Sequence, residues 1–273
     1  MKTAKMKTVK EGKLGRYTLR IVDTAGKLQG VAFKDSTHRT AIMDGDEIDE
    51  LWERLSVEVG MQAAEYVGYA GAISRFRQIF PAGFADPRYL TKERDYKIAA
   101  ISKLAEAAPL DEAFAGMANP EAVLKACQTN LLFRSESIAL RAILLHRLGG
   151  EFVQAAARMA MGEIKDGLAV MTRIAEAVDR KSWPLVTYLP FLWQPDDHMF
   201  LKPTVATGFA ERVGHRFAHD YSSEIRAETY EGLLDLTKET RSAIASLKPA
   251  DNVDVQSFIW AVAKYTDADA AEE

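Results

Sequence analysis

The residues with the clearest potential for chemistry form a polar insert in an otherwise apolar segment. Asp196, Asp197 and His198 are consecutive and Lys202 follows, within WPLVTYLPFLWQPDDHMFLKP at 183–203. Neighbouring aspartate and histidine side chains can share a proton or bind a metal ion, although a metal site needs at least about three ligands. These four residues are the candidate catalytic residues of a metal-dependent hydrolase, and the local sequence alone does not complete a metal site.

A second group of candidate metal ligands lies in ERVGHRFAHDY. If this segment is helical, Glu211, His215 and His219 share one face, and two histidines one turn apart can bind a metal ion together. The zinc-protease pattern needs glutamate directly after the first histidine, where this chain has Arg216, and Gly214 weakens the helix. We therefore expect solvated polar residues here, with His215 and His219 as the candidate ligands if a metal is bound; no cofactor is predicted.

Basic and aromatic residues alternate between residues 74 and 97. The cations are Arg75, Arg77, Arg88, Lys92, Arg94 and Lys97, all but Lys92 being candidate phosphate contacts, and the aromatic residues between them are Phe76, Phe80, Phe84, Tyr89 and Tyr96. Arginines beside aromatic rings can hold phosphates and stack on bases, which predicts a nucleic-acid-binding surface. The alternative is that the rings belong to the core and the cations are solvated or paired with Glu93 and Asp95.

Motifs of several enzyme classes are absent from the sequence. There is no phosphate-binding P-loop, no dinucleotide-binding glycine pattern after a strand, no G-x-S-x-G nucleophile motif and no paired C-x-x-C. Cys127 is the single cysteine, which excludes an internal disulfide, and no base lies near it in the sequence. We expect it to be a small buried apolar residue.

Composition narrows the classes of partner. The net charge of −4 argues against a protein covered in DNA-binding charge, although a local basic patch remains compatible with it. No apolar run approaches the roughly 18–20 residues needed to cross a bilayer, so no membrane partner is expected. The basic first residues are followed by a charged, alternating segment, so we expect no secretory signal and a cytoplasmic location.

The chain begins with signals for a small β unit. Residues 1–13 read as a basic flexible arm, and 14–58 as a β-hairpin unit followed by a helix. Tyr17, Leu19 and Ile21 alternate with polar residues, DTAGK supplies a turn, and LQGVAF predicts the returning strand. A third short strand near Thr40–Met43 fits the same pattern.

The remainder, 59–265, predicts a helical domain, followed by an acidic tail at 266–273. Asn119 before Pro120 is typical of a helix start, and Asp254 is placed to cap the last helix. The alanine-rich stretch at 151–178 reads as one long helix or as two divided near Gly162. The four prolines of 183–203 predict an extended, kinked ribbon, which we call the strap, held across the core by its large apolar side chains.

The sequence therefore predicts a mainly α (α+β) fold, a multi-helix globular bundle with a small N-terminal antiparallel β-hairpin unit. The expected function is that of a cytoplasmic binding or accessory protein whose partner is nucleic acid or another protein, with an oligomer left open. The alternatives are the metal-dependent hydrolase and a structural subunit of a larger assembly that presents the exposed faces of 151–178 to a partner.

Overall fold

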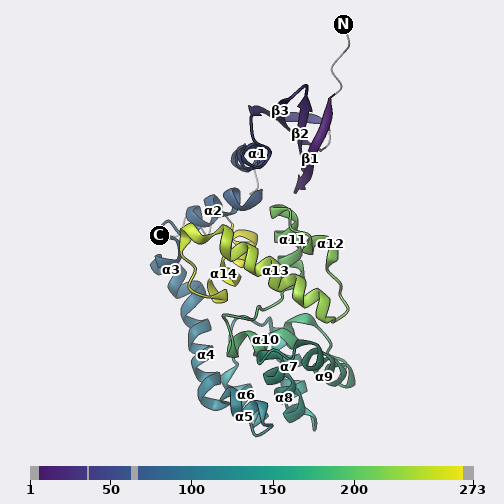
Figure 1. Cartoon of the computed structure of the whole chain (residues 1–273). Coiled ribbons are helices and arrows are strands. Elements are labelled where there is room, and N and C mark those ends of the chain that lie inside the picture. Colours follow the sequence, from purple (N-terminus) through teal and green to yellow (C-terminus); the bar gives the residue numbers. More distant parts are fainter. Residues whose placement is uncertain (1–5, 36, 63–66, 267–273) are drawn as a thin grey trace.

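The computed structural model describes residues 6–35, 37–62 and 67–266. A four-stranded antiparallel sheet with one covering helix stands at one end of a larger helical body (Figure 1). Each part has its own cluster of buried apolar residues. The predicted mainly α fold with a small N-terminal β unit is confirmed.

The sheet is a meander in the order β1-β2-β3-β4. Its strands are β1 (Lys7–Leu14), β2 (Tyr17–Thr24), β3 (Lys27–Lys34) and β4 (His38–Gly45). Leu19 pairs with Ala32, and Ala32 pairs with Ala41, so these buried side chains share one face. Helix α1 (Ile48–Gln62) covers that face, and Gly30 leaves room there for the side chains of Leu51 and Leu55.

The basic arm expected at 1–13 does not extend to residue 13. Residues 7–14 form strand β1, which pairs with β2 along its length. Residues 10–13 pair with a strand whose inward side chains are buried, and pairing satisfies backbone groups that a free arm would leave to water. The part of the predicted arm at 1–5 lies outside the described residues.

The helical body follows α1. Its α-helices are α2 (Gly68–Ile79), α3 (Pro87–Tyr89), α4 (Asp95–Ala107), α5 (Leu110–Phe114), α6 (Pro120–Ala126), α7 (Arg134–Leu144), α8 (Gly149–Ala160), α9 (Ile164–Ala177), α10 (Trp183–Trp193), α11 (Pro203–Val213), α12 (Phe217–Asp220), α13 (Ala227–Ala243) and α14 (Asn252–Lys264). Short turns of other helical type are η1 (Gly83–Ala85), η2 (Leu90–Arg94) and η3 (Ala245–Leu247). In the described part of the chain, no helix is both long enough and apolar enough to cross a membrane.

Two glycines with positive φ separate helices in this body. Gly162, at φ 98°, follows α8, so the alanine-rich stretch is two helices, one of the two readings of the sequence. Gly214, at φ 76°, ends α11 in the left-handed conformation that favours glycine. Glu211, His215 and His219 are therefore not on one continuous helix, and the shared face considered from the sequence does not form.

The strap at 183–203 is not an extended ribbon in its first half. Residues 183–193 form α10, in which every side chain from Trp183 to Leu192 is buried. Pro184 lies in the first turn, where the backbone N–H groups have no partner within the helix. Pro190 lies near the C-terminal end, so only the last few residues of the helix follow the hydrogen bond that it removes. The prediction of an extended ribbon was wrong for this half because the apolar surface that α10 buries outweighs one lost backbone hydrogen bond.

The second half of the strap is irregular and firmly attached. Met199, Phe200 and Leu201 are buried, and the Leu201 N–H donates to Thr187 Oγ1 of α10 over 3.0 Å. The Thr187 hydroxyl in turn donates to the Trp183 carbonyl over 2.8 Å. The prediction that its own apolar side chains hold this segment in place is confirmed.

The β unit meets the body at the turn between β1 and β2. The Gly15 N–H donates to the Glu211 carbonyl over 3.3 Å, at the end of α11. Leu14 lies directly against Gly214, where a Cβ atom would be 2.9 Å from Leu14 Cδ2. The absence of a side chain at Gly214 is what allows this close approach.

Candidate functional site

The basic and aromatic segment passes through a π-helical turn, η2, between α3 and α4. Such wide turns are rare, and they occur frequently at functional sites. The turn packs against α14 and carries Glu93, which is buried, and Arg94, which is partly buried. The segment therefore joins a buried polar network instead of forming a free surface.

Arg94 is the centre of one half of this network. Its two terminal nitrogens donate to the carboxylate of Asp251 over 3.0 and 2.7 Å, and Nη1 also donates to Asp254 Oδ1 over 2.6 Å. The hydrogen bonds to Asp251 raise the pKa of Arg94. Burial opposes ionisation of Asp251, but the hydrogen bonds and charge of Arg94 outweigh it, so the pKa of Asp251 is lowered. Arg94 is thus a cation whose charge is balanced inside the protein.

The same network sets the start of α14. Asp251, not Asp254, is the capping residue, and its carboxylate accepts from the backbone N–H groups of Val253 and Asp254. Asp254 accepts instead from Arg94 and from the Tyr89 hydroxyl. The sequence-based assignment of Asp254 as the cap was wrong because the helix starts earlier than the apolar pattern indicates. By contrast, Asn119 caps α6 as predicted.

Lys97 is completely buried in the other half of the network. Its ammonium donates to Glu93 Oε2, Gln256 Oε1 and Ser257 Oγ over 2.8, 2.7 and 2.8 Å. The Tyr265 hydroxyl donates to the second carboxylate oxygen of Glu93 over 2.7 Å. Burial lowers the pKa of Lys97, and the charge of Glu93 opposes that shift. A side chain with no exposed surface and three internal acceptors has no donor left for a phosphate.

Two other predicted phosphate contacts, Arg75 and Arg88, are also hydrogen-bonded inside the protein. Arg75 donates to the Tyr265 carbonyl over 2.9 Å, and Arg88 donates to the Ile79 carbonyl. The rings of Phe76, Phe80, Phe84 and Tyr89 are buried and contact one another. For these residues the alternative interpretation agrees with the structure: the rings belong to the core, and the cations are hydrogen-bonded inside the protein.

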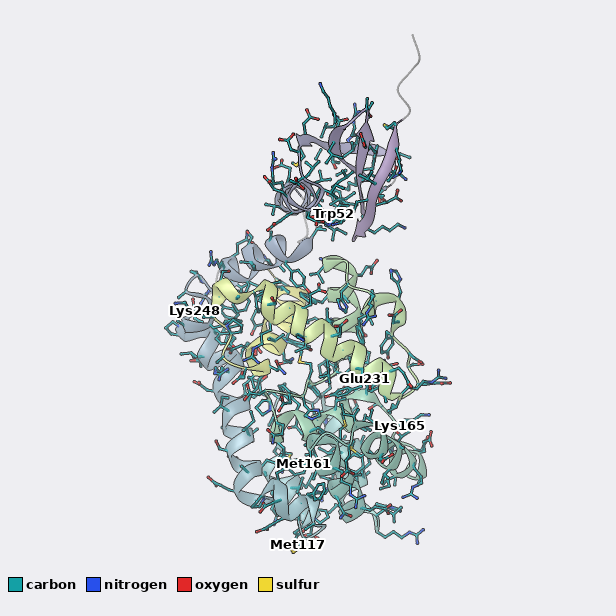
Figure 2. The ribbon with its side chains drawn as sticks, viewed as in Figure 1. Trp52, Met117, Met161, Lys165, Glu231 and Lys248 are labelled. Atoms are coloured by element: carbon teal, nitrogen blue, oxygen red, sulfur yellow. The ribbon has the colours of Figure 1, made fainter. Side chains whose placement is uncertain are left out.

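Arg77 is the exception, and it lines a cleft of about 580 Å³. The cleft lies between the end of α2, the turn at 81–85, η2 and the turn after η3; its lining residues are Arg77, Pro81, Ala82, Gly83, Phe84, Ala85, Leu90, Arg94, Ser246, Leu247, Lys248, Ala250 and Asp254. Arg77 and Lys248 are exposed, and within the described ranges neither side chain has a hydrogen-bond or ion-pair partner. Lys248 lies at the margin of the helical body (Figure 2).

Lys248 was missed from the sequence. It stands in a Lys–Pro turn far along the chain from Arg77, with no aromatic or basic neighbours to mark it. Its φ of 58° places it in the left-handed region after η3. Only the packing of η3 beside the 81–85 turn brings it to the cleft.

A second, smaller cavity of about 20 Å³ lies beside Lys97. Its lining residues are Glu93, Tyr96, Lys97, Asn130, Leu131, Phe200, Lys202, Gln256 and Trp260. Lys202 Nζ hydrogen-bonds to Glu136 and lies 3.7 Å from the centre of the Phe133 ring. Burial lowers the pKa of Lys202, while the hydrogen bond to Glu136 opposes the shift.

The candidate catalytic residues of the strap are not brought together with Lys202. Asp196 and Asp197 are exposed, whereas His198 is 3% exposed and its Nδ1 lies 3.1 Å from the Tyr230 hydroxyl. Burial lowers the pKa of His198. Asn252 Nδ2 donates to the carbonyls of Asp196 and His198, which fixes this turn against α14. These contacts stabilise the turn, and no shared proton or metal geometry is formed.

The two candidate metal-binding histidines, His215 and His219, lie in different environments. His215 is buried, accepts from the Phe217 N–H through Nδ1, and directs Nε2 toward Asp235 and Glu239 at 3.5 and 3.7 Å. His219 is exposed. Among the described residues, no three His, Cys, Asp or Glu side chains are grouped so that they would hold a metal ion. Cys127 is buried, and burial raises the pKa of its thiol to about 12.

Comparison with known proteins provides no relative, because no family model, no curated protein and no solved structure matches the chain.

Proposed function

We propose that the protein is a non-catalytic nucleic-acid-binding protein, and that the cleft beside η2 binds the phosphodiester backbone. The supporting observation is that two exposed cations, Arg77 and Lys248, line one cleft, and neither side chain has a partner among the residues that the structure describes. The other four candidate phosphate contacts, Arg75, Arg88, Arg94 and Lys97, hydrogen-bond inside the protein. An unbalanced pair of positive charges in a concave surface is the arrangement that attracts phosphate.

The charge of the cleft supports this choice of ligand. Asp254 is the only carboxylate among its lining residues, and Arg94 and Tyr89 already bind it. The lining residues Arg77, Arg94 and Lys248 against Asp254 give the cleft a net charge of +2. Asp251, which is paired with Arg94 behind the lining, reduces this to +1, so the cleft remains positive because of Arg77 and Lys248.

The walls of the cleft favour backbone contacts over base contacts. Its apolar lining comes from small residues, Pro81 and partly buried aliphatic side chains, and its one aromatic ring, Phe84, is buried. A base would find no exposed ring to stack on. Phosphate contacts position a nucleic acid without reading its sequence, so we propose binding of low sequence specificity.

The test is a fluorescence-anisotropy titration of labelled single- and double-stranded oligonucleotides at two salt concentrations. The double variant R77A/K248A is expected to bind at least about tenfold more weakly at low salt. Loss of two phosphate contacts should also reduce the slope of log K against log salt by about 1.4 for a single strand and about 1.8 for a duplex.

The matched control is K125A/R147A, which removes two exposed cations from α6 and the turn before α8. This control has the same net charge as R77A/K248A, so it should retain the affinity of the wild type if the cleft is the site. Equal weakening by both variants would show a general charge effect and contradict the proposed site. Absence of binding by the wild type at low salt would refute the proposed function.

A further inference from the structure

One aromatic side chain, Phe133, is unusually exposed beside the small cavity at Lys97, and a half-buried tryptophan lies next to it. Phe133 is 54% exposed, and its ring centre lies 6.3 Å from that of Trp260, which is half-buried and lines the cavity. Tyr96, also half-buried, lines the cavity as well. Large rings left in water at the rim of a polar hollow are available to stack on a planar ligand.

The Phe133 ring is held in place by its surroundings. Glu136 accepts from the Phe133 backbone N–H over 2.7 Å at the start of α7, and the same carboxylate hydrogen-bonds to Lys202. The Lys202 ammonium then lies against one face of the Phe133 ring. Because one face is covered and the residue is still half exposed, a planar group has a preorganised surface on which to stack.

Unpartnered amides lie next to these rings. Gln256 is 6% exposed, and its Oε1 accepts from Lys97, which directs Nε2 away from the lysine. Within the described ranges this Nε2 has no hydrogen-bond partner, and neither does the exposed Asn130 amide. Gln256 therefore offers a donor and Asn130 offers a donor and an acceptor side by side, groups that can pair with the edge of a nucleobase.

The charges of the hollow select a neutral ligand. Lys97 is balanced by Glu93, and Lys202 is balanced by Glu136, so neither lysine leaves an uncompensated charge for a phosphate. The cavity beneath the rings has room for about one water molecule, so a base would lie on its rim. The rim therefore fits a neutral planar ring with polar edges.

The hollow and the phosphate cleft lie along the same helix. Asp254 of α14 lines the cleft, and Gln256 and Trp260 of α14 line the hollow. Six residues of helix from Asp254 to Trp260 rise about 9 Å. One strand of nucleic acid covers that distance in about three nucleotides at its ~3.4 Å spacing in a duplex, and in fewer when extended.

We propose that Phe133, Trp260, Asn130 and Gln256 form a base-stacking subsite, and that the ligand is single-stranded nucleic acid. This inference rests on the proposed function, since the cleft supplies the backbone contacts. Base faces are covered in a duplex, so only an unpaired, splayed base can reach the rings. The subsite adds a preference for single strands to a cleft that reads only phosphates.

The experiment compares W260L and F133L with F114L in anisotropy titrations. Phe114, a 36% exposed phenylalanine on α5, lines neither cavity, so F114L is a control for loss of an exposed ring. Single-stranded DNA, single-stranded RNA, an abasic strand of equal length and a duplex are titrated. Circular dichroism and urea unfolding establish that each variant is folded, and F133L is the variant that perturbs the core least.

We expect W260L and F133L to weaken single-strand binding by about fivefold to 150-fold, the range reported for loss of one base–aromatic stack. Duplex affinity should not change, and F114L should behave as the wild type. The abasic strand should bind the wild type as weakly as the intact strand binds W260L.

The outcomes separate the two proposals. If R77A/K248A weakens binding while W260L and F133L bind single strands as the wild type does, the subsite is wrong and the cleft stands. Equal wild-type affinity for abasic and intact strands would also overturn the subsite. If the wild type binds none of the four ligands, both proposals fail.

Discussion

The basic residues near the two cavities fall into two groups, those whose charge is balanced by a buried carboxylate and those whose charge is not. Arg94 and Lys97 have buried carboxylate partners, whereas Arg77 and Lys248 have none within the described ranges. Removing one member of a buried pair leaves the other charge uncompensated, which is costly, whereas an exposed lone cation contributes little to stability. The first pair is therefore expected to matter for folding and the second for ligand binding.

Replacing Lys97 by methionine should reduce the free energy of unfolding by about 3–5 kcal/mol, because Glu93 would remain buried without its cation. K103M, at an exposed position of the same helix, should change it by less than about 0.5 kcal/mol. Urea unfolding measures both values. Adding E93Q to K97M should recover part of the loss, and a K97M protein as stable as the wild type would contradict a structural role for the pair.

His198 should make stability depend on pH. Burial lowers the pKa of its imidazole in the folded state, so the unfolded chain takes up the proton first as pH falls. The contribution of the neutral ring is complete above the unfolded pKa of about 6.5 and decreases as pH drops below it, by up to about 1.4 kcal/mol per pH unit. Urea unfolding at pH 7.5 and 5.5 should show a smaller decrease for H198Q than for wild type.

His219 provides the control for that measurement. It is exposed, so H219Q is the matched control for replacing a histidine by glutamine. An H198Q protein with the wild-type pH dependence would assign the acid sensitivity to other groups.

At the scale of elements, η2 and α14 form the unit that places both cavities. The wide turn directs Glu93, Arg94 and Lys97 toward α14, which supplies Asp254, Gln256 and Ser257 as their partners. The cleft and the hollow are where this pair of elements meets its neighbours. Because the polar network is bonded throughout, the surfaces at both cavities are held at fixed positions.

Gly214 is the element-scale feature that controls how the β unit meets the body. G214A would place a Cβ atom 2.9 Å from Leu14 Cδ2 and 3.1 Å from the Lys13 carbonyl, at a φ of 76°. We expect a loss of more than the roughly 1–3 kcal/mol that such a backbone conformation costs alone. G162A, with φ 98° and no atom within 4 Å of the added Cβ, isolates the backbone cost.

Urea unfolding of the two alanine variants provides the comparison. A greater loss for G214A than for G162A is the expected result, since only Gly214 has neighbours in the space of the added methyl group. Equal losses of unfolding free energy would mean that the Leu14 side chain moves away from the added methyl group at no energetic cost.

At the scale of the whole molecule, the net charge predicts that a nucleic acid would be attracted to the cleft and not to the protein surface in general. The net charge of −4 repels a polyanion, so the proposed binding is expected to depend on the two cations of the cleft and to weaken with salt as two phosphate contacts predict. The β unit stands at one end of the body and Met117 marks the other (Figure 1, Figure 2). The cleft and the hollow both belong to the body, where α14 joins them.

The sequence by itself determined the classes of element and much of what is buried. Period-two alternation predicted strands, alanine-rich stretches and Asn119–Pro120 predicted helices, and the apolar side chains of 183–203 predicted burial, because these signals are local. It predicted an extended strap where α10 forms, since the cost of proline is local whereas the gain from burial depends on the surrounding helices.

Tertiary structure decided which polar residues are available for a ligand. Arg77 and Arg94 belong to the same basic segment, yet Asp251 and Asp254 bind Arg94, whereas the Arg77 side chain has no partner in the part of the chain that the structure describes. Lys248 and Trp260 reach the two cavities only through the packing of η3 and α14. Contacts between residues far apart in the sequence determine which charges are paired, and a side chain that is paired inside the protein is not available to bind a ligand.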